Sequence, residues 1–203
     1  TPLLENNEKQ KLALAEIQNG FSKIMQQELD AMWAAKLGLS SPNQPLVDEL
    51  FVLMTQYAAD YTLFFRELCL LPKDPKLLEP TLYASMVPSD TPEKTAKRSA
   101  QCKVWLDKWH AALQNDAVAK DMSAQAITKK MKAVNPKYMW REWFVATAYQ
   151  QASEGDYSLV RELQSLMSKP YSEQSKDIEA KYYVRKPLSF FAVGGLSHYS
   201  CSS

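Results

Sequence analysis

The fold class follows from residues 7–38, which read NEKQKLALAEIQNGFSKIMQQELDAMWAAKLG. Their apolar side chains recur at helical spacing and not with the two-residue period of a strand. The recurring apolar residues are Leu12, Ile17, Phe21, Ile24, Met25, Leu29, Met32 and Trp33. Gly38 stands where a glycine commonly ends a helix, because glycine readily adopts the left-handed backbone conformation. The pattern predicts one long helix over about 7–36.

Helix signals continue along the chain. Asp60 is placed to cap free N–H groups, and Thr91-Pro92 combines a cap with a proline in the first turn. Asn135-Pro136 repeats that arrangement between two further helices, and Gly155-Asp156 separates the last two. Predicted helices cover about 45–57, 60–71, 91–113, 136–154 and 156–169, with one more shortly before Asn135.

The composition supports an all-α fold, since the 203 residues include only five glycines and many strong helix formers. The stretch 72–90 carries four prolines but keeps apolar residues, so it is interpreted as a long loop and not as a domain boundary. We therefore expect a multi-helix bundle over 1–186, followed by an extended tail over 187–203. The chain opens without a start methionine, and the simplest interpretation is that it begins within a longer protein.

The charge balance argues against nucleic-acid and membrane partners. The chain has 24 basic and 23 acidic residues and a net charge of +1. A nucleic-acid or anionic-membrane surface would require a marked basic excess. The densest basic run, Lys129, Lys130, Lys132 and Lys137, is interpreted as a solvated helix face. No apolar stretch approaches the roughly 20 residues that span a bilayer.

Cysteine and histidine offer little for metal or nucleophilic chemistry. Cys69 and Cys102 fall in apolar helical surroundings and are expected to be small buried side chains. The three cysteines form no disulfide framework, which suits a reducing compartment. His110 and His198 have no cysteine or carboxylate at metal-ligand spacing, and Gly194-Gly195 lacks the context of a phosphate loop. We expect no metal site and no cofactor site in this chain.

Two groups of aromatic and charged residues leave a choice between function and packing. In the first, Asp60 and Arg66 could face a ligand, but capping by Asp60 and a local ion pair at Arg66 are preferred. In the second, four tryptophans form two pairs that each share a helix face: Trp105, Trp109, Trp140 and Trp143. Nucleic-acid binding would require interleaved arginines, so core packing is preferred for all four.

Three segments together resemble the selenoprotein O family of kinase-like proteins. The first joins KLGL at 36–39 to ADYTLFFREL at 59–68. The second runs from VNPKYMWR at 134–141 through GDYS at 155–158 to KPYSEQ at 169–174. The third is the chain end, Ser200-Cys201-Ser202-Ser203. Their order and separation make the resemblance specific from about residue 36 to the last residue.

The resemblance implies an AMP transferase with a protein-kinase-like fold, of which this chain is the C-terminal helical extension. Members transfer AMP from ATP onto Ser, Thr or Tyr hydroxyls of protein substrates, with Mg or Mn. Such a transfer needs a metal-holding Asp/Asn pair and cations that clamp the phosphates. In the family these residues precede the region seen here. No catalytic residue is therefore expected in this chain, and its expected partner is the upstream kinase-like domain.

Cys201 is the one residue to which the resemblance gives a role. Some members carry selenocysteine at this third position from the end, and others carry cysteine. In the family it is linked to redox control by pairing with a cysteine of the kinase-like region. A tail from Pro187 onward could extend roughly 55 Å, enough to reach a neighbouring lobe. The alternative is an idle terminal thiol.

The tail also departs from the family. The expected Tyr-x-x-x-Pro-Pro segment is replaced by YVRKPL at 183–188, and FFAVGG at 190–195 is unlike the family as well. A different class of function stays open: a stand-alone helical interaction module without an enzymatic parent. The family is mitochondrial in many eukaryotes and cytoplasmic in bacteria, and the residues here do not favour either compartment.

Overall fold

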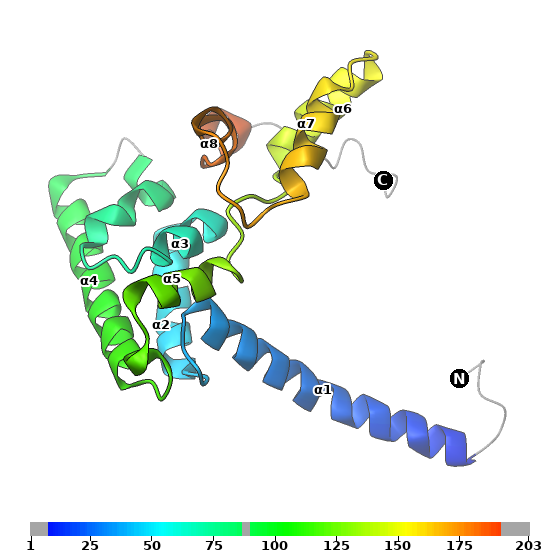
Figure 1. Cartoon of the computed structure of the whole chain (residues 1–203), viewed down its shortest axis with the longest axis vertical. Helices are drawn as coiled ribbons and strands as arrows, with labels where there is room; N and C mark the ends of the chain where they lie inside the picture. Colours follow the sequence, from blue (N-terminus) through cyan, green and yellow to red (C-terminus); the bar gives the residue numbers. More distant parts are fainter. Residues whose placement is uncertain (1–7, 87–89, 192–203) are drawn as a thin grey trace.

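The computed structural model describes residues 8–86 and 90–191, and within them every regular element is a helix. The all-α class is thus confirmed for these residues (Figure 1). The α-helices are α1 Glu8–Lys36, α2 Gln44–Gln56, α3 Tyr61–Leu68, α4 Pro92–Asn115, α5 Ala124–Lys132, α6 Glu142–Ser153, α7 Ser158–Met167 and α8 Lys176–Tyr182. Short 3-10 helices are η1 Pro75–Leu77, η2 Glu79–Thr81, η3 Tyr83–Met86, η4 Ala119–Asp121 and η5 Leu188–Phe191. None of the described helices combines the length and apolar content that a bilayer crossing demands.

The larger hydrophobic core lies between α2, α3, α4 and α5 and includes the last turn of α1. Trp105 and Trp109 stack on each other with ring centroids 5.9 Å apart. Their indole N–H groups donate to the backbone oxygens of Leu46 and Leu37 at 3.0 and 2.9 Å, so no polar atom of either ring is left unpaired in the core. The predicted packing role of this tryptophan pair is confirmed.

The irregular stretch after α3 is fastened to the larger core. The backbone N–H groups of Asp60 and Tyr83 donate to Thr81 O and Ala58 O at 2.8 and 3.0 Å. Arg98 of α4, only 2% exposed, pairs with both Glu79 and Asp90. The stretch predicted as a loop therefore forms three successive 3-10 turns; η1 packs on α4, and η2 is joined to α4 by the Arg98–Glu79 ion pair.

A smaller core brings together α6, α7 and α8. Its buried residues are Tyr138, Ala148, Leu163, Leu166 and Tyr182. The sequence predicted α6 and α7 but not α8, which Ser175 caps by accepting a hydrogen bond from Ile178 N. The C-terminal region of the described chain thus carries its own hydrophobic cluster, distinct from the one around Trp109.

The predicted helix start at Pro136 is wrong, because α6 begins only at Glu142. Residues 136–141 instead contact the segment after α7. The N–H groups of Lys137 and Tyr138 both donate to Pro170 O, at 2.8 and 3.1 Å. Asn135 does not cap the next helix either. Its Nδ2 donates to Lys36 O at 3.0 Å in the larger core.

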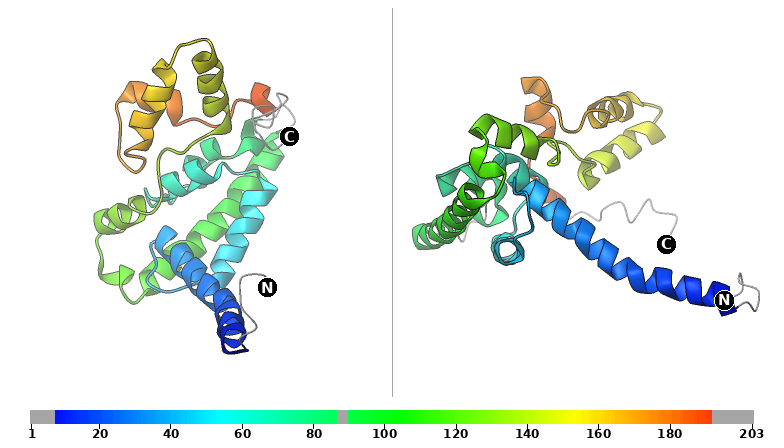
Figure 2. Two further views of the ribbon diagram at one scale, coloured as in Figure 1. Left: turned by 90° about the vertical axis from the view of Figure 1, so that its right-hand side faces the viewer. Right: turned by 60° about the horizontal axis from the view of Figure 1, so that its bottom comes forward.

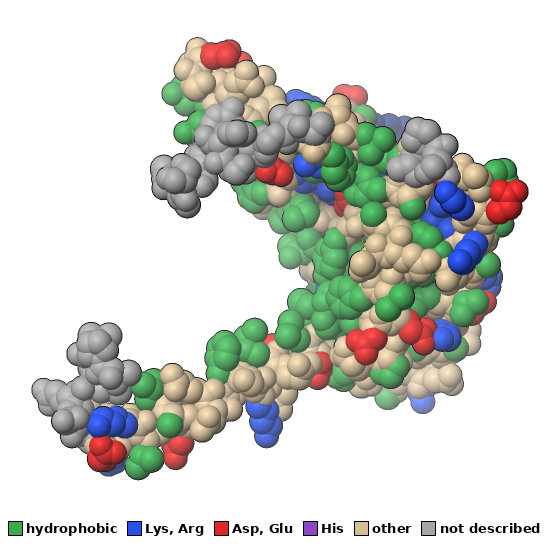
Figure 3. Space-filling view, turned by 180° about the vertical axis from the view of Figure 1, so that it is seen from behind, with side chains coloured by type: hydrophobic (Ala, Val, Ile, Leu, Met, Phe, Trp, Pro, Cys, Tyr) green, Lys and Arg blue, Asp and Glu red, His purple; other side chains and the backbone are tan. Residues whose placement is uncertain are grey.

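Helix α1 extends away from the rest of the structure (Figures 1 and 2). Only Ala34 and Lys36, both in its last turn, are buried. The two hydrophobic cores and α1 together surround a hollow, which is visible from behind (Figure 3). The long helix predicted over 7–36 is confirmed from Glu8 onward, but most of its apolar residues are exposed in the described part of the chain.

Candidate functional site

Asp60 and Arg141 form a buried ion pair between the two cores. Arg141 Nη1 donates to Asp60 Oδ2 at 2.6 Å, and Nη2 donates to Oδ1 at 2.9 Å. The Asp60 side chain is 3% exposed and that of Arg141 9%. Asp60 also accepts from Leu63 N, which caps α3, and from the Tyr83 hydroxyl at 3.3 Å. These partners confirm the preferred capping role and leave no free carboxylate oxygen to face a ligand.

Arg66 is fully engaged in structural hydrogen bonds. It is 4% exposed, and its Nη1 donates to the backbone oxygens of Lys132 and Asn135. Its Nη2 donates to Tyr171 O at 3.1 Å and to Glu173 Oε1 at 2.7 Å. Arg66 forms an ion pair as predicted, but the prediction of a local partner is wrong, because Glu173 lies 107 positions away in the sequence. Arg66 therefore fastens the segment after α7 to α3.

Glu173 is surrounded by three cations. Besides Arg66, it accepts hydrogen bonds from Lys132 Nζ at 2.8 Å and from Lys137 Nζ, which also pairs with Glu179. Burial would raise the pKa of Glu173, but the hydrogen bonds from Lys132, Lys137 and Arg66 outweigh it and lower the pKa to about 2. Lys137 is 7% exposed. The predicted solvated helix face is therefore wrong for Lys137, which is buried and lies outside the helices. Lys129 is exposed as predicted, and Lys130 and Lys132 are partly exposed.

The segment after α8 is held by hydrogen bonds to the larger core. The Tyr183 hydroxyl donates to Glu67 Oε1 at 2.7 Å, and burial together with this bond raises the pKa of Tyr183. Arg185 Nη1 donates to Leu82 O at 2.5 Å, and Lys186 N donates to the Tyr83 hydroxyl at 2.8 Å. Hydrogen bonds from Arg185 and Lys186 thus hold the segment after α8 against residues 82–85.

The remaining candidate residues, a histidine and the second tryptophan pair, differ in their surroundings. The Nε2 atom of His110 lies 3.0 Å from Pro72 O. Trp143 is 9% exposed, but Trp140 is 56% exposed, so the predicted core role is wrong for Trp140. Its neighbour Arg141 turns into the Asp60 ion pair, which leaves the Trp140 side chain on the outside. Across residues 8–86 and 90–191, no three Cys, His, Asp or Glu side chains are grouped as a metal ion would require.

The cysteines divide into two groups. Cys69 and Cys102 are buried and free, as predicted. Burial raises the pKa of both thiols, that of Cys102 to about 11. Cys201, His198 and Gly194-Gly195 lie outside the described residues, so the proposed redox role of Cys201 stays a prediction.

An uncovered apolar face is the most prominent surface feature of the described chain. On α1 it consists of Ile17, Phe21, Ile24, Met25, Leu29 and Met32, which we call the apolar stripe; their exposed fractions run from 39% to 69%. At the base of α1 the stripe meets aromatic rings, since Trp33 contacts Phe51 and Tyr61. Figure 3 shows apolar side chains gathered in the hollow and continuing onto α1. A run of exposed apolar side chains is typical of an interaction surface, so the stripe is a candidate interface.

The spacing of the apolar residues in the stripe predicts a helix but not that its apolar face is exposed. Helical periodicity shows that one face is apolar and cannot show what covers that face. In the described chain nothing covers it.

Comparison with known proteins links the chain to one family. The family model described as "Protein adenylyltransferase SelO" matches residues 4–168. A relative from Azoarcus sp. (strain BH72), named "Protein nucleotidyltransferase YdiU", is 32% identical over 191 residues, covering 91% of this chain and 34% of the relative. Proteins of the same name match from Xanthomonas oryzae pv. oryzae (strain PXO99A; 35% identity, 84% of this chain, 32% of the relative) and Vibrio vulnificus (strain CMCP6; 30%, 100% and 38%). The chain spans about a third of the length of the curated relatives it matches.

Proposed function

Because the chain belongs to the SelO family, we propose that it is the C-terminal helical part of a protein adenylyltransferase. The parent transfers AMP from ATP to Ser, Thr or Tyr hydroxyls of protein substrates, and this region supports the catalytic lobe. The observation that carries the proposal is the family match over residues 4–168, and the exposed apolar stripe on α1 adds support in a chain that spans about a third of its relatives' length. A surface with that composition fits the rest of a longer protein.

ATP and its Mg or Mn ion belong, in this proposal, to the remainder of the parent. Two carboxylates of the described residues are already engaged in ion pairs, which supports placing the nucleotide site elsewhere in the parent. Asp60 is held by Arg141, and Glu173 by three cations. Phosphoryl chemistry needs carboxylates free to hold metal ions and cations free to clamp phosphates. We therefore assign the helices of this chain a supporting role.

Support of the catalytic lobe is assigned to the apolar stripe and the aromatic rings at its base. Phe21 is 61% exposed and lies near the middle of the stripe. Removing a large apolar side chain from water contributes about 1.5–3 kcal/mol. Burial of several such side chains on one face is sufficient to hold two parts of a protein together, and no ion pair is required. We assign the upstream kinase-like lobe as the part that covers them.

Cys201 is proposed as the redox-regulatory residue of the parent. Cys69 and Cys102 are buried, so neither is accessible for exchange with a second thiol. The partner of Cys201 would then be a cysteine outside this chain. Disulfide formation removes two protons and two electrons from the two thiols, which a peroxide can accept. Mass mapping of the peroxide-treated parent should show a disulfide from Cys201 to an upstream cysteine; a Cys201 thiol that stays reduced would remove the redox role.

The decisive experiment compares Phe21→Asp with Asn19→Asp, in this chain and in the full-length parent. Both substitutions add one negative charge to an exposed position of α1, but Asn19 lies on the face opposite the stripe. In the 203-residue chain neither variant should lower the melting temperature, because neither side chain is packed. In the parent, Phe21→Asp should weaken stability and AMP transfer from labelled ATP, whereas Asn19→Asp should leave both unchanged.

Two outcomes would contradict the proposal. Equal behaviour of the two variants in the parent would show that the stripe is not covered there. AMP transfer by the 203-residue chain alone would show that catalysis does not depend on an upstream lobe.

A non-catalytic helical interaction module is the alternative function. The same uncovered stripe favours it, since a module of that kind also presents an apolar face to its partner. The coding sequence upstream of Thr1 separates the two functions. A kinase-like lysine, glutamate and Asp-Asn set encoded there would support the enzyme, and its absence would support the module.

A further inference from the structure

A groove of about 740 Å³ lies at the surface of the larger core, between α4, α5 and the link from α3 to η1. Its floor is aliphatic and includes Leu71, Leu113, Met122 and Ile127. Leu113 and Ile127 are 5% and 7% exposed, so the floor is part of the packed core. Its volume lies in the range of ligand-binding sites, about 300–1,000 Å³.

The rim of the groove is cationic. Lys73, Lys120, Lys129 and Lys132 line it, and no Asp or Glu is among its lining residues. Lys132 already pairs with Glu173. The other three are exposed, and no carboxylate within residues 8–86 and 90–191 forms an ion pair with them. The groove therefore has three lysines available for an anionic partner.

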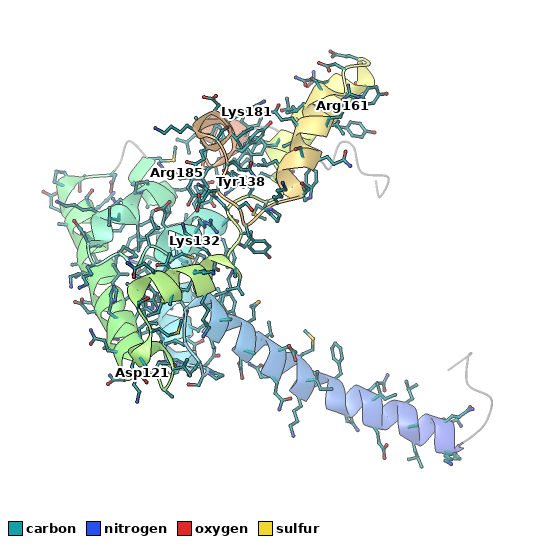
Figure 4. The ribbon with its side chains drawn as sticks, viewed as in Figure 1. Asp121, Lys132, Tyr138, Arg161, Lys181 and Arg185 are labelled. Atoms are coloured by element: carbon teal, nitrogen blue, oxygen red, sulfur yellow. The ribbon has the colours of Figure 1, made fainter. Side chains whose placement is uncertain are left out.

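The lysines are spread along the groove. Lys73 precedes η1, Lys120 lies in η4, and Lys129 and Lys132 lie in the last turn of α5. Figure 4 labels Lys132 near one end of α5 and Asp121, the neighbour of Lys120, near the other. The nine residues of α5 measure about 13 Å. One carboxylate cannot contact cations at both ends, but several carboxylates along an extended ligand can.

From this distribution we propose that the groove binds an acidic peptide segment of a partner protein, with large aliphatic side chains inserted between its carboxylates. The aliphatic side chains fill the floor around Leu113, and the carboxylates pair with Lys73, Lys120 and Lys129. A single-headed lipid would use only one end of the cationic rim. A nucleobase would stack on aromatic rings, and the lining contains no Phe, Tyr or Trp.

The test is a phage-display selection in which a random peptide library is panned on the full 203-residue chain. Enriched peptides should carry Asp or Glu beside Leu, Ile or Met. Their affinity, measured by fluorescence anisotropy, should fall at least about tenfold in the double variant Lys120→Glu/Lys129→Glu and should decrease with added salt. Both lysines are exposed, so the double variant should keep the circular dichroism and melting temperature of the wild type.

Lys130→Glu is the matched control, because Lys130 lies in the same last turn of α5 but does not line the groove. It should change the affinity by less than about twofold. The proposal is overturned if the selection enriches no acidic peptides, or if Lys130→Glu weakens binding as much as the double variant. Binding of anionic phospholipid vesicles that is lost only in the double variant would overturn the peptide and assign the groove to a membrane surface. Because binding is measured on the chain alone, the result is independent of the proposed AMP transfer.

Discussion

Arg141 forms a two-pronged ion pair with Asp60, with donor–acceptor distances of 2.6 and 2.9 Å, and so joins the smaller hydrophobic core to α3 of the larger one. The two residues are 81 positions apart in the sequence. The contact is buried on both sides, and Asp60 also caps α3. A single carboxylate therefore begins a helix and holds a distant segment at the same time.

Replacing Arg141 with methionine should destabilise the chain by about 3–5 kcal/mol, because Asp60 would be left buried without its counter-charge. Urea unfolding followed by circular dichroism measures the change. Lys181→Met provides the control, since Lys181 pairs with Glu162 at the surface, where its side chain is 51% exposed. That variant should lose less than about 0.5 kcal/mol. Similar losses for the two variants would show that burial does not set the strength of the Asp60–Arg141 pair.

Replacing Glu173 with glutamine should destabilise the chain near neutral pH and have little effect near pH 2. The pKa of Glu173 is lowered from 4.5 to about 2, so its contribution is complete above about pH 4.5 and disappears as the pH falls toward 2. The loss at pH 7 should be on the order of 1 kcal/mol, because 53% of the side chain is exposed and solvent screens the ion pairs. Unfolding of wild type and variant between pH 2 and 7 gives the difference. A difference that does not change with pH would contradict the role of the carboxylate charge.

Replacing Gly38 with alanine should cost about 2 kcal/mol or more. Its φ is +75°, and a Cβ atom would lie 3.0 Å from Met131 Sδ and 3.2 Å from Ile127 Cγ2. Gly155→Ala separates the two causes, because Gly155 has φ +91° but no atom within 4 Å of the added Cβ. That variant should cost about 1 kcal/mol from the backbone alone. Thermal unfolding of the two variants should show the larger loss at Gly38, and a reversed order would mean that the contact with α5 is not tight.

Cys69 and Cys102 should react with a thiol reagent such as Ellman's reagent on the order of a hundredfold more slowly in the folded chain than in guanidinium. Both thiols are buried, and burial raises their pKa values, so little thiolate is available at neutral pH. A thiol that reacts fast in the folded chain should therefore be Cys201. Peptide mapping after brief labelling identifies the residue, and early labelling of Cys69 or Cys102 would contradict their placement in the core.

The sequence was sufficient to predict the elements whose signals are local. Asp60 and Thr91 cap helices as their side chains suggested, and the end of α1 near Gly38 agrees with the glycine rule. The tryptophans at 105 and 109 share a helix face and are packed in the core. Each of these predictions depends on residues within about one helical turn.

The start of α6 could not be predicted in the same way. Asn135-Pro136 has the composition of a helix start, but the N–H groups of Lys137 and Tyr138 are used by Pro170 O. Arg141 forms an ion pair with Asp60, and Lys137 forms ion pairs with Glu173 and Glu179. These tertiary contacts override local propensity, and no pattern within residues 134–141 indicates them. The groove between α4 and α5 could not be predicted for the same reason, because its lysines come from three separate segments.

Helix α1 is anchored only at its C-terminal end, and this affects its association with the surface that covers the apolar stripe. The helix has 29 residues and is about 43 Å long, but only its last turn is packed, so the remainder depends on its own backbone hydrogen bonds. Hydrogen exchange should accordingly become faster from Trp33 toward Glu8. Covering the stripe would then complete the helix and form the interface in one coupled step, and the ordering entropy would lower the affinity of that step. Gly20→Ala, which adds a methyl group with no atom within 4 Å, would preorder the helix and tighten the association without a new contact.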